Sequence, residues 1–187
     1  MPSWFARFML WLLRMRVVDH NSEWPPKTVV AVAPHTSFRD FPYGLYSRSV
    51  LGVDIKFVGK AELFKGPTGA ILKWLGGVPV DRSKRGNFVE RVAAIFDERE
   101  SFHLCVAIEG TRKPVQKFKT GFYYIAKTAA VPIILCRFDF GNRKIEFSKP
   151  FWPTDDVEAD MEFFYQHFDG IEGLKKSGSF YRAQESD

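Results

Sequence analysis

Residues 28–40 read TVVAVAPHTSFRD, an apolar, β-branched run that stops at Pro34 and is followed at once by His35 and Asp40. A run of this composition predicts a strand buried on both faces, as in a parallel sheet. A connection that only had to turn would more often use Gly, Asn or Ser. The histidine and the acid therefore indicate either a structural turn stiffened by Pro34 and Pro42 or a functional site.

The rest of the chain alternates predicted strands and helices. Strands are expected near 28–33, 55–58, 78–80, 103–108, 132–138 and 143–148, and helices near 42–51, 68–75, 87–98, 119–129 and 156–168. This order predicts an α/β fold with a mostly parallel central sheet flanked by helices, and an antiparallel hairpin within 136–147. At 187 residues we expect one domain over 27–187, preceded by a helix within residues 1–20.

That amino-terminal stretch, SWFARFMLWLLRMRVV at 3–18, is the most hydrophobic segment of the chain. On a helical wheel Ser3, Arg7 and Arg14 share a narrow stripe, and apolar side chains cover much of the rest. Such an amphipathic helix is typical of the membrane interface; the alternative is a core helix whose arginines reach out to water. It lacks the cleavage site of a signal peptide and the ~20 apolar residues of a spanning helix, so we do not expect it to cross a membrane.

Charge is distributed unevenly around a net value of +5. Residues 56–91 hold eight Lys or Arg against three acids, 112–127 hold five with no acid, and 155–172 hold seven acids with no Lys or Arg. We expect a basic side that suits phosphorylated substrates, anionic lipid headgroups or nucleic acid. The two cysteines, Cys105 and Cys136, lie in apolar runs, which indicates a reducing compartment without a disulfide framework.

His35 is a candidate general base, since histidine ordinarily titrates near pH 6.5. Asp40 could accept a hydrogen bond from the other ring nitrogen and stabilise the imidazolium. No G-x-S-x-G motif supplies a serine nucleophile, and Ser37 is equally a helix-capping residue. Cys105 shares a strand face with His103, so a Cys/His pair is a weaker alternative. We therefore expect a base that activates a substrate hydroxyl or water.

A second group of polar residues follows the strand at 103–108. Glu109, Gly110, Thr111 and Arg112 resemble an anion site, because Gly permits close approach of the backbone, Thr offers a hydroxyl and Arg matches phosphate. The cations that could add charge are Lys60, Arg82 and Lys113. Metal binding is not expected, since the four histidines are scattered and no cluster has ligand spacing.

With these residues in view, the sequence resembles the glycerophospholipid acyltransferases over about residues 28–150. The family's H-x-x-x-x-D motif is matched by His35 and Asp40, and its second region by GKAELFKGPTGAILKWLGGVPVDR, which ends at Asp81 and Arg82. Its E-G-T-R motif is Glu109 to Arg112, and its V-P-I step is Val131 to Ile133. The chain has Pro34 before the motif histidine and Ile108 before E-G-T-R, where family members often have Asn and Pro.

The resemblance implies an O-acyltransferase in which His35 deprotonates an acceptor hydroxyl and Asp40 orients the base. It implies that Glu109, Gly110, Thr111 and Arg112, with Arg82, hold a lysophospholipid acceptor, by default 1-acylglycerol-3-phosphate. Lys60 is a further candidate for binding this substrate, by its charge. The donor would be a thioester of acyl carrier protein or coenzyme A, with no resident cofactor and no metal. Such an enzyme would work in phospholipid biosynthesis in the cytoplasm, peripherally on the inner face of the cytoplasmic membrane.

Three other functions stay open at this point. A catalytically idle protein that binds anionic lipid would have no use for the spacing of His35 and Asp40. A hydrolase would use the same base to activate water. A nucleic-acid binder is disfavoured, because most aromatic residues lie in apolar runs rather than among the basic ones.

Overall fold

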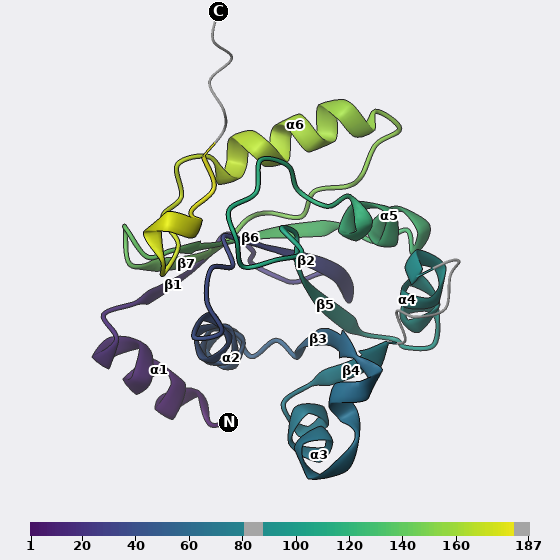
Figure 1. Ribbon diagram of the computed structural model, residues 1–187. Helices are drawn as coiled ribbons and strands as arrows, with labels where there is room; N and C mark the ends of the chain where they lie inside the picture. Colours follow the sequence, from purple (N-terminus) through teal and green to yellow (C-terminus); the bar gives the residue numbers. More distant parts are fainter. Residues whose placement is uncertain (81–87, 182–187) are drawn as a thin grey trace, which may run out of the picture.

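The computed structural model describes residues 1–80 and 88–181, and within them seven strands form one sheet in the order β1-β7-β6-β2-β5-β3-β4 (Figure 1). The strands are β1 Arg16–Asp19, β2 Lys27–Ala33, β3 Ile55–Lys60, β4 Gly77–Val80, β5 Phe102–Ala107, β6 Ile133–Asp139 and β7 Lys144–Phe147. The helices are α1 Ser3–Leu12, α2 Asp40–Leu51, α3 Gly66–Trp74, α4 Phe88–Asp97, α5 Gly121–Thr128 and α6 Val157–Phe168, with 3₁₀ turns η1 Ala61–Phe64 and η2 Lys176–Gly178.

The centre of the sheet is β2, which pairs in parallel with β5 on one side and β6 on the other. Val29 and Ala31 pack into a core with α4, α5 and α6, whereas Val30 and Val32 pack on the opposite face toward α1 and α2. Both faces of the strand are therefore buried, which is why its sequence is continuously apolar instead of alternating. The predicted α/β fold with a mostly parallel sheet is confirmed.

The predicted hairpin is also confirmed. Strand β6 pairs antiparallel with β7, in a register that places Asp139 opposite Lys144. The carboxylate of Asp139 closes the turn, because its two oxygens accept from the backbone and the side-chain amide of Asn142, both at 2.9 Å. Asp and Asn side chains commonly stabilise turns in this way.

The amino-terminal helix does not extend over the whole apolar run 3–18. Helix α1 ends at Leu12, Arg14 adopts a left-handed φ of 54°, and β1 then pairs in parallel with β7. The amides of Met15 and Arg14 donate to the carbonyls of Leu10 and Trp11, which is the hydrogen-bond pattern of a Schellman cap. The helix ends there because Val17 and Val18 pair with strand β7, which is distant in the sequence.

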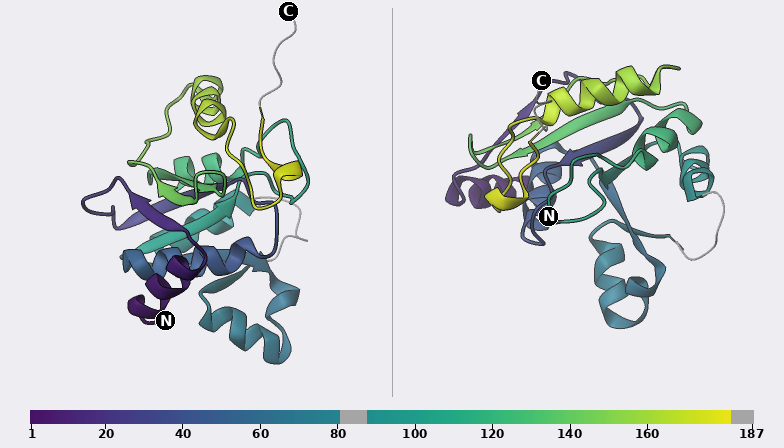
Figure 2. Two further views of the ribbon diagram at one scale, coloured as in Figure 1. Left: turned by 90° about the vertical axis from the view of Figure 1, so that its left-hand side faces the viewer. Right: turned by 45° about the horizontal axis from the view of Figure 1, so that its top comes forward.

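Helices cover the two faces of the sheet unequally (Figures 1 and 2). Helices α4, α5 and α6 cover one face and α2 the other, with α1 packed against α2. Helix α3 packs against η1 and the edge strand β4, and it projects beyond the sheet. In the described ranges, no helix combines the length and the hydropathy that crossing a membrane would require.

Candidate active site

The first two polar motifs meet because β2 and β5 are parallel neighbours. Val32 pairs with Ala107, and the amide of Ile108 donates to the carbonyl of Val32 at 3.2 Å. Both strands therefore end at the same edge of the sheet, where ligands bind in open α/β folds. His35 follows the end of β2 and Glu109 follows the end of β5, so the two residues lie at the same edge.

His35 and Asp40 form a pair at this edge. Nδ1 of His35 lies 3.2 Å from Oδ2 of Asp40, and the histidine side chain is 28% exposed whereas that of the aspartate is fully buried. The same Oδ2 accepts from the backbone amides of Thr36 and Ser37, each at 2.8 Å. Asp40 thus closes the loop and also orients the ring. Because Nδ1 faces the carboxylate, Nε2 is the nitrogen left for a substrate.

Glu109 lies differently from the predicted substrate contact. Its carboxyl is 1% exposed, and Oε2 accepts from the backbone amide of His35 at 2.6 Å. Burial raises the pKa of Glu109 to about 7, although the amide and the charge of His35 partly oppose this. Glu109 therefore holds the loop that carries the base, and it points into the protein rather than toward solvent.

The buried carboxyl predicts a pH-dependent effect of Glu109→Gln on stability. Between the ordinary pKa of 4.5 and the folded pKa of about 7, the unfolded chain is ionised at this position while the folded chain keeps the proton. Wild-type stability should therefore fall as pH rises through this range, by roughly 3 kcal/mol at ~1.4 kcal/mol per pH unit. The neutral Gln has no such loss. The free energy of unfolding of the variant should therefore rise relative to that of wild type between pH 5 and 8.

Urea unfolding of both proteins across this pH range measures the difference directly. Contributions from other titrating groups cancel when the two free energies of unfolding are subtracted. A difference that stays constant with pH would mean that Glu109 titrates normally.

The E-G-T-R loop presents its last residues to solvent. Gly110 has a left-handed φ of 67°, which favours glycine, and its amide donates to the carbonyl of Ala107. Thr111 and Arg112 are exposed, and Oγ1 of Thr111 accepts from the amide of Lys113 at 3.2 Å. The loop thus offers a hydroxyl and a guanidinium to solvent, whereas the carboxyl of Glu109 is buried.

Of the predicted cations, Lys60 is placed only in part and Arg82 lies outside the described residues. Lys60 is the last residue of β3, which runs parallel to β5, so its backbone reaches the same edge of the sheet as His35. Its side chain, together with Asp81 and Arg82 after the end of β4, lies outside what the structure describes.

An apolar side chain that the sequence analysis did not single out lies in the loop of the base. Phe38 is 72% exposed and stacks on Phe41, which in turn contacts Phe57 of β3 edge to face. Large exposed apolar residues beside a polar site are typical of surfaces that meet apolar ligands. The signal was available in the sequence, as an aromatic residue placed between the motif histidine and aspartate.

Residues 16–138, more than half of the chain, match the sequence model of the family described as Acyltransferase. The chain belongs to the acyltransferase family. It is 34% identical over 141 residues to 1-acyl-sn-glycerol-3-phosphate acyltransferase beta from Homo sapiens, a match covering 71% of this chain and 49% of the human protein. The chain thus spans about half the length of this curated relative.

The family fold is also seen in a solved structure. The crystal structure of the 1-acyl-sn-glycerophosphate acyltransferase PlsC from Thermotoga maritima aligns with a TM-score of 0.57 and 22% identity, over 88% of this chain and 73% of that one. The predicted family resemblance is confirmed by the family match, and the predicted architecture by the shared fold.

A carboxyl-terminal segment outside the part that matches the acyltransferase family supports the motif loop. The amide of Lys175 donates to Oγ1 of the buried Thr36 at 3.0 Å, and a Cβ at Gly173 would overlap the Thr36 side chain. Only a residue without a side chain can approach the loop so closely. No local pattern in the sequence indicates this contact, because its two partners are far apart along the chain.

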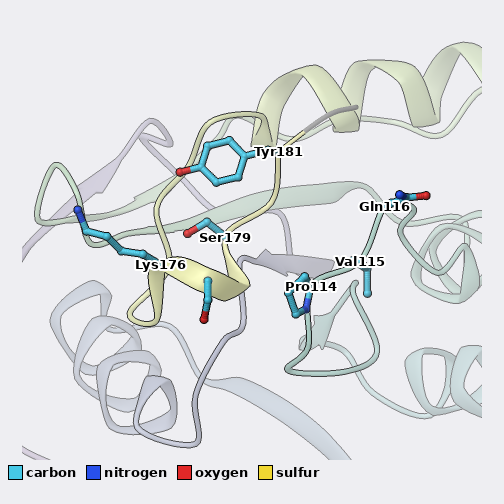
Figure 3. A pocket seen from close by; sticks show the side chains of 7 residues that line it. Pro114, Val115, Gln116, Lys176, Ser179 and Tyr181 are labelled. Carbon is cyan, nitrogen blue, oxygen red and sulfur yellow. The ribbon is translucent and has the colours of Figure 1, made fainter. Parts of the chain in front are cut away.

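The same segment borders a cavity of about 510 Å³ beside the E-G-T-R loop (Figure 3). One wall carries Pro114, Val115 and Gln116, which come shortly after Arg112, and the other carries Lys176, Ser177, Ser179 and Tyr181. The ammonium of Lys176 is already paired with Glu172 at 3.2 Å. The lining of the cavity is therefore a mixed polar and apolar surface.

The alternative Cys/His pair is not supported. Burial raises the pKa of the Cys105 thiol to about 12, so no reactive thiolate forms near neutral pH. Nδ1 of His103 lies 3.1 Å from the Thr28 hydroxyl near the start of β5, at the opposite edge of the sheet from His35. Among the described residues, no cluster of three His, Cys, Asp or Glu could hold a metal ion.

Proposed function

We propose that this protein transfers a fatty acyl chain from an acyl thioester to a hydroxyl of a lysophospholipid, with 1-acylglycerol-3-phosphate as the acceptor. The observation that carries the proposal is the His35–Asp40 pair, in which a part-exposed imidazole is oriented by a fully buried carboxylate at the ligand-binding edge of the sheet. The human and Thermotoga relatives are, by name, a 1-acyl-sn-glycerol-3-phosphate acyltransferase and a 1-acyl-sn-glycerophosphate acyltransferase, which supports this acceptor class.

In the proposed reaction Nε2 of His35 removes the proton of the acceptor hydroxyl as that oxygen attacks the thioester carbonyl. The new C–O bond gives a tetrahedral oxyanion, whose collapse breaks the C–S bond. The thiolate then leaves and takes the proton back from His35. Asp40 stabilises the imidazolium between these two transfers. The reaction needs no covalent enzyme intermediate and no resident cofactor.

The remaining groups divide between the two substrates. Thr111 and Arg112 are exposed and suited to the phosphate of the acceptor, because guanidinium groups bind phosphate with two parallel hydrogen bonds. Phe38 offers an apolar surface to an acyl chain beside the base. The donor is a thioester of coenzyme A or acyl carrier protein. Both present the same reacting group to His35, so the proposed mechanism is the same for either donor.

We also propose that α1 attaches the protein peripherally to the inner face of the cytoplasmic membrane. Its exposed side chains include Trp4, Phe8, Trp11 and Leu12, while Ala6 and Leu10 face the protein. Apolar surface of this kind, flanked by arginines, is typical of helices at a lipid interface. A membrane-bound enzyme would meet its lysophospholipid acceptor within the lipid surface.

The proposal is tested by thiol release from a long-chain acyl thioester in the presence of vesicles, with and without lysophosphatidate. Coenzyme A and acyl carrier protein thioesters are compared in parallel, and the acylated lipid product is identified. Release that depends on the acceptor supports acyl transfer. Release without acceptor, with free fatty acid as product, would make the protein a hydrolase and overturn the proposal.

Arg112→Ala should weaken use of the acceptor more than the chemical step. Loss of a bidentate phosphate contact should raise KM for lysophosphatidate about tenfold or more, with a smaller change in kcat. Arg112→Lys should recover part of the loss, because it keeps the charge without the planar fork. Steady-state kinetics with varied acceptor measure the effect.

Lys149→Ala is the matched control, because Lys149 is exposed and follows β7, whose antiparallel direction places it at the other edge of the sheet. Equal effects of the alanine variants at Arg112 and Lys149 would show a general loss of surface charge rather than a phosphate site.

A further inference from the structure

Helix α3 presents an apolar face away from the protein. Pro67, Ala70, Ile71 and Trp74 recur at helical spacing and are all exposed, Trp74 by 78%. The inner side of the helix is marked by Gly69, where a Cβ would collide with the backbone of Phe64. A surface helix ordinarily turns its apolar stripe toward the core, whereas the apolar face of α3 is exposed.

The charges around this face favour an anionic occupant. Lys65 and Lys73 are exposed, and residues 55–80 contain four Lys and one acid, Glu62 of the adjacent turn η1. Tryptophan and lysine together are enriched where proteins meet the headgroup region of a membrane. A second copy of the chain would instead bring two net basic segments together, which like-charge repulsion disfavours.

Helix α3 lies on the same side of the molecule as α1. In two views related by a quarter turn, α1 and α3 both lie on the lower side of the molecule, while α6 lies on the upper side (Figures 1 and 2). Helix α1 has the same character, with Trp11 73% exposed, Arg7 exposed and no acid before Asp19. Two separate basic and aromatic elements on one side can contact one plane.

We propose that α3 is a second membrane-contact element, and that it inserts Ile71 and Trp74 into the same anionic lipid surface as α1. The inference rests on the membrane attachment proposed for α1, and it adds the orientation of the domain. A single helix leaves the domain free to rotate about its attachment, whereas two contacts fix how the edge with His35 faces the lipid.

The test measures partition of the full chain onto phosphatidylcholine vesicles with and without phosphatidylglycerol. Trp74→Ser should lower the partition coefficient on anionic vesicles roughly tenfold, because an interfacial aromatic side chain is lost. Trp74→Phe should restore most of the binding. Lys73→Glu should weaken binding to anionic vesicles and leave binding to pure phosphatidylcholine unchanged.

Trp152→Ser is the matched control, since Trp152 is 61% exposed and follows Phe151, which stacks on Phe163 of α6 on the other side of the molecule. Wild-type-like partition of Trp74→Ser, or an equal loss in Trp152→Ser, would overturn the inference. So would concentration-dependent dimerisation that Trp74→Ser abolishes without lipid, because α3 would then contact a second copy.

Two further measurements separate this inference from the proposals on which it rests. Trp11→Ser reports on α1 alone. If Trp11→Ser lowers partition onto vesicles and Trp74→Ser does not, α1 is the attachment and α3 does not contact the membrane. Acyl transfer to a water-soluble, short-chain lysophosphatidate should be equal in wild type and Trp74→Ser. Transfer in solution by a wild type that does not bind vesicles would overturn the membrane contact and leave the proposed reaction intact.

Discussion

His35→Ala is expected to lower kcat for acyl transfer by about 10²–10⁴-fold, the usual contribution of a general base. The loss should appear in kcat because the base acts on the reacting proton, while KM for both substrates should change little. The side chain is 28% exposed, so its removal leaves no large internal cavity and the fold should persist. Acceptor-dependent thiol release and a thermal unfolding curve measure the two properties on the same preparation.

His20→Ala serves as the control, because His20 is an exposed histidine whose Nε2 contacts Glu146 at 2.9 Å, away from the loop of the base. It should retain wild-type transfer. A mild and equal effect of both substitutions would remove His35 from the role of base, and the proposed mechanism would fail at its first step.

Much of the fold could be predicted because it depends on local composition. Strand β2 is continuously apolar since it is buried on both faces, and the Asp139–Asn142 turn carries its own hydrogen bonds. Strand β1 could not be predicted in the same way. Val17 and Val18 continue an apolar helical pattern, and only their pairing with Ile145 and Glu146 makes them a strand.

The candidate site shows the same division. His35 lies in the loop before α2 and Asp40 is the first residue of that helix, so their pairing follows from spacing. Glu109 joins them because parallel strands end at one edge. The direction of the Glu109 carboxyl was not predictable, because it is set by the amide of His35 in three dimensions. The support that Lys175 gives to Thr36 likewise depends on a contact between distant segments.

The charge of Asp40 and its role in closing the loop can be separated by two substitutions. In Asp40→Asn a carbonyl oxygen at the position of Oδ2 would still accept from Thr36, Ser37 and Nδ1 of His35. What is lost is the negative charge that stabilises the imidazolium. We expect kcat to fall about 100-fold or more while the free energy of unfolding changes little.

Asp40→Ala should show both losses. Two amides in a buried loop would lack their acceptor, at a cost of about 1–3 kcal/mol for each unsatisfied group, and His35 would lose its orientation. Urea unfolding and transfer kinetics on the two variants distinguish the roles. If Asp40→Asn kept full activity while Asp40→Ala lost stability, Asp40 would be a turn residue, and the base would act without a charged partner.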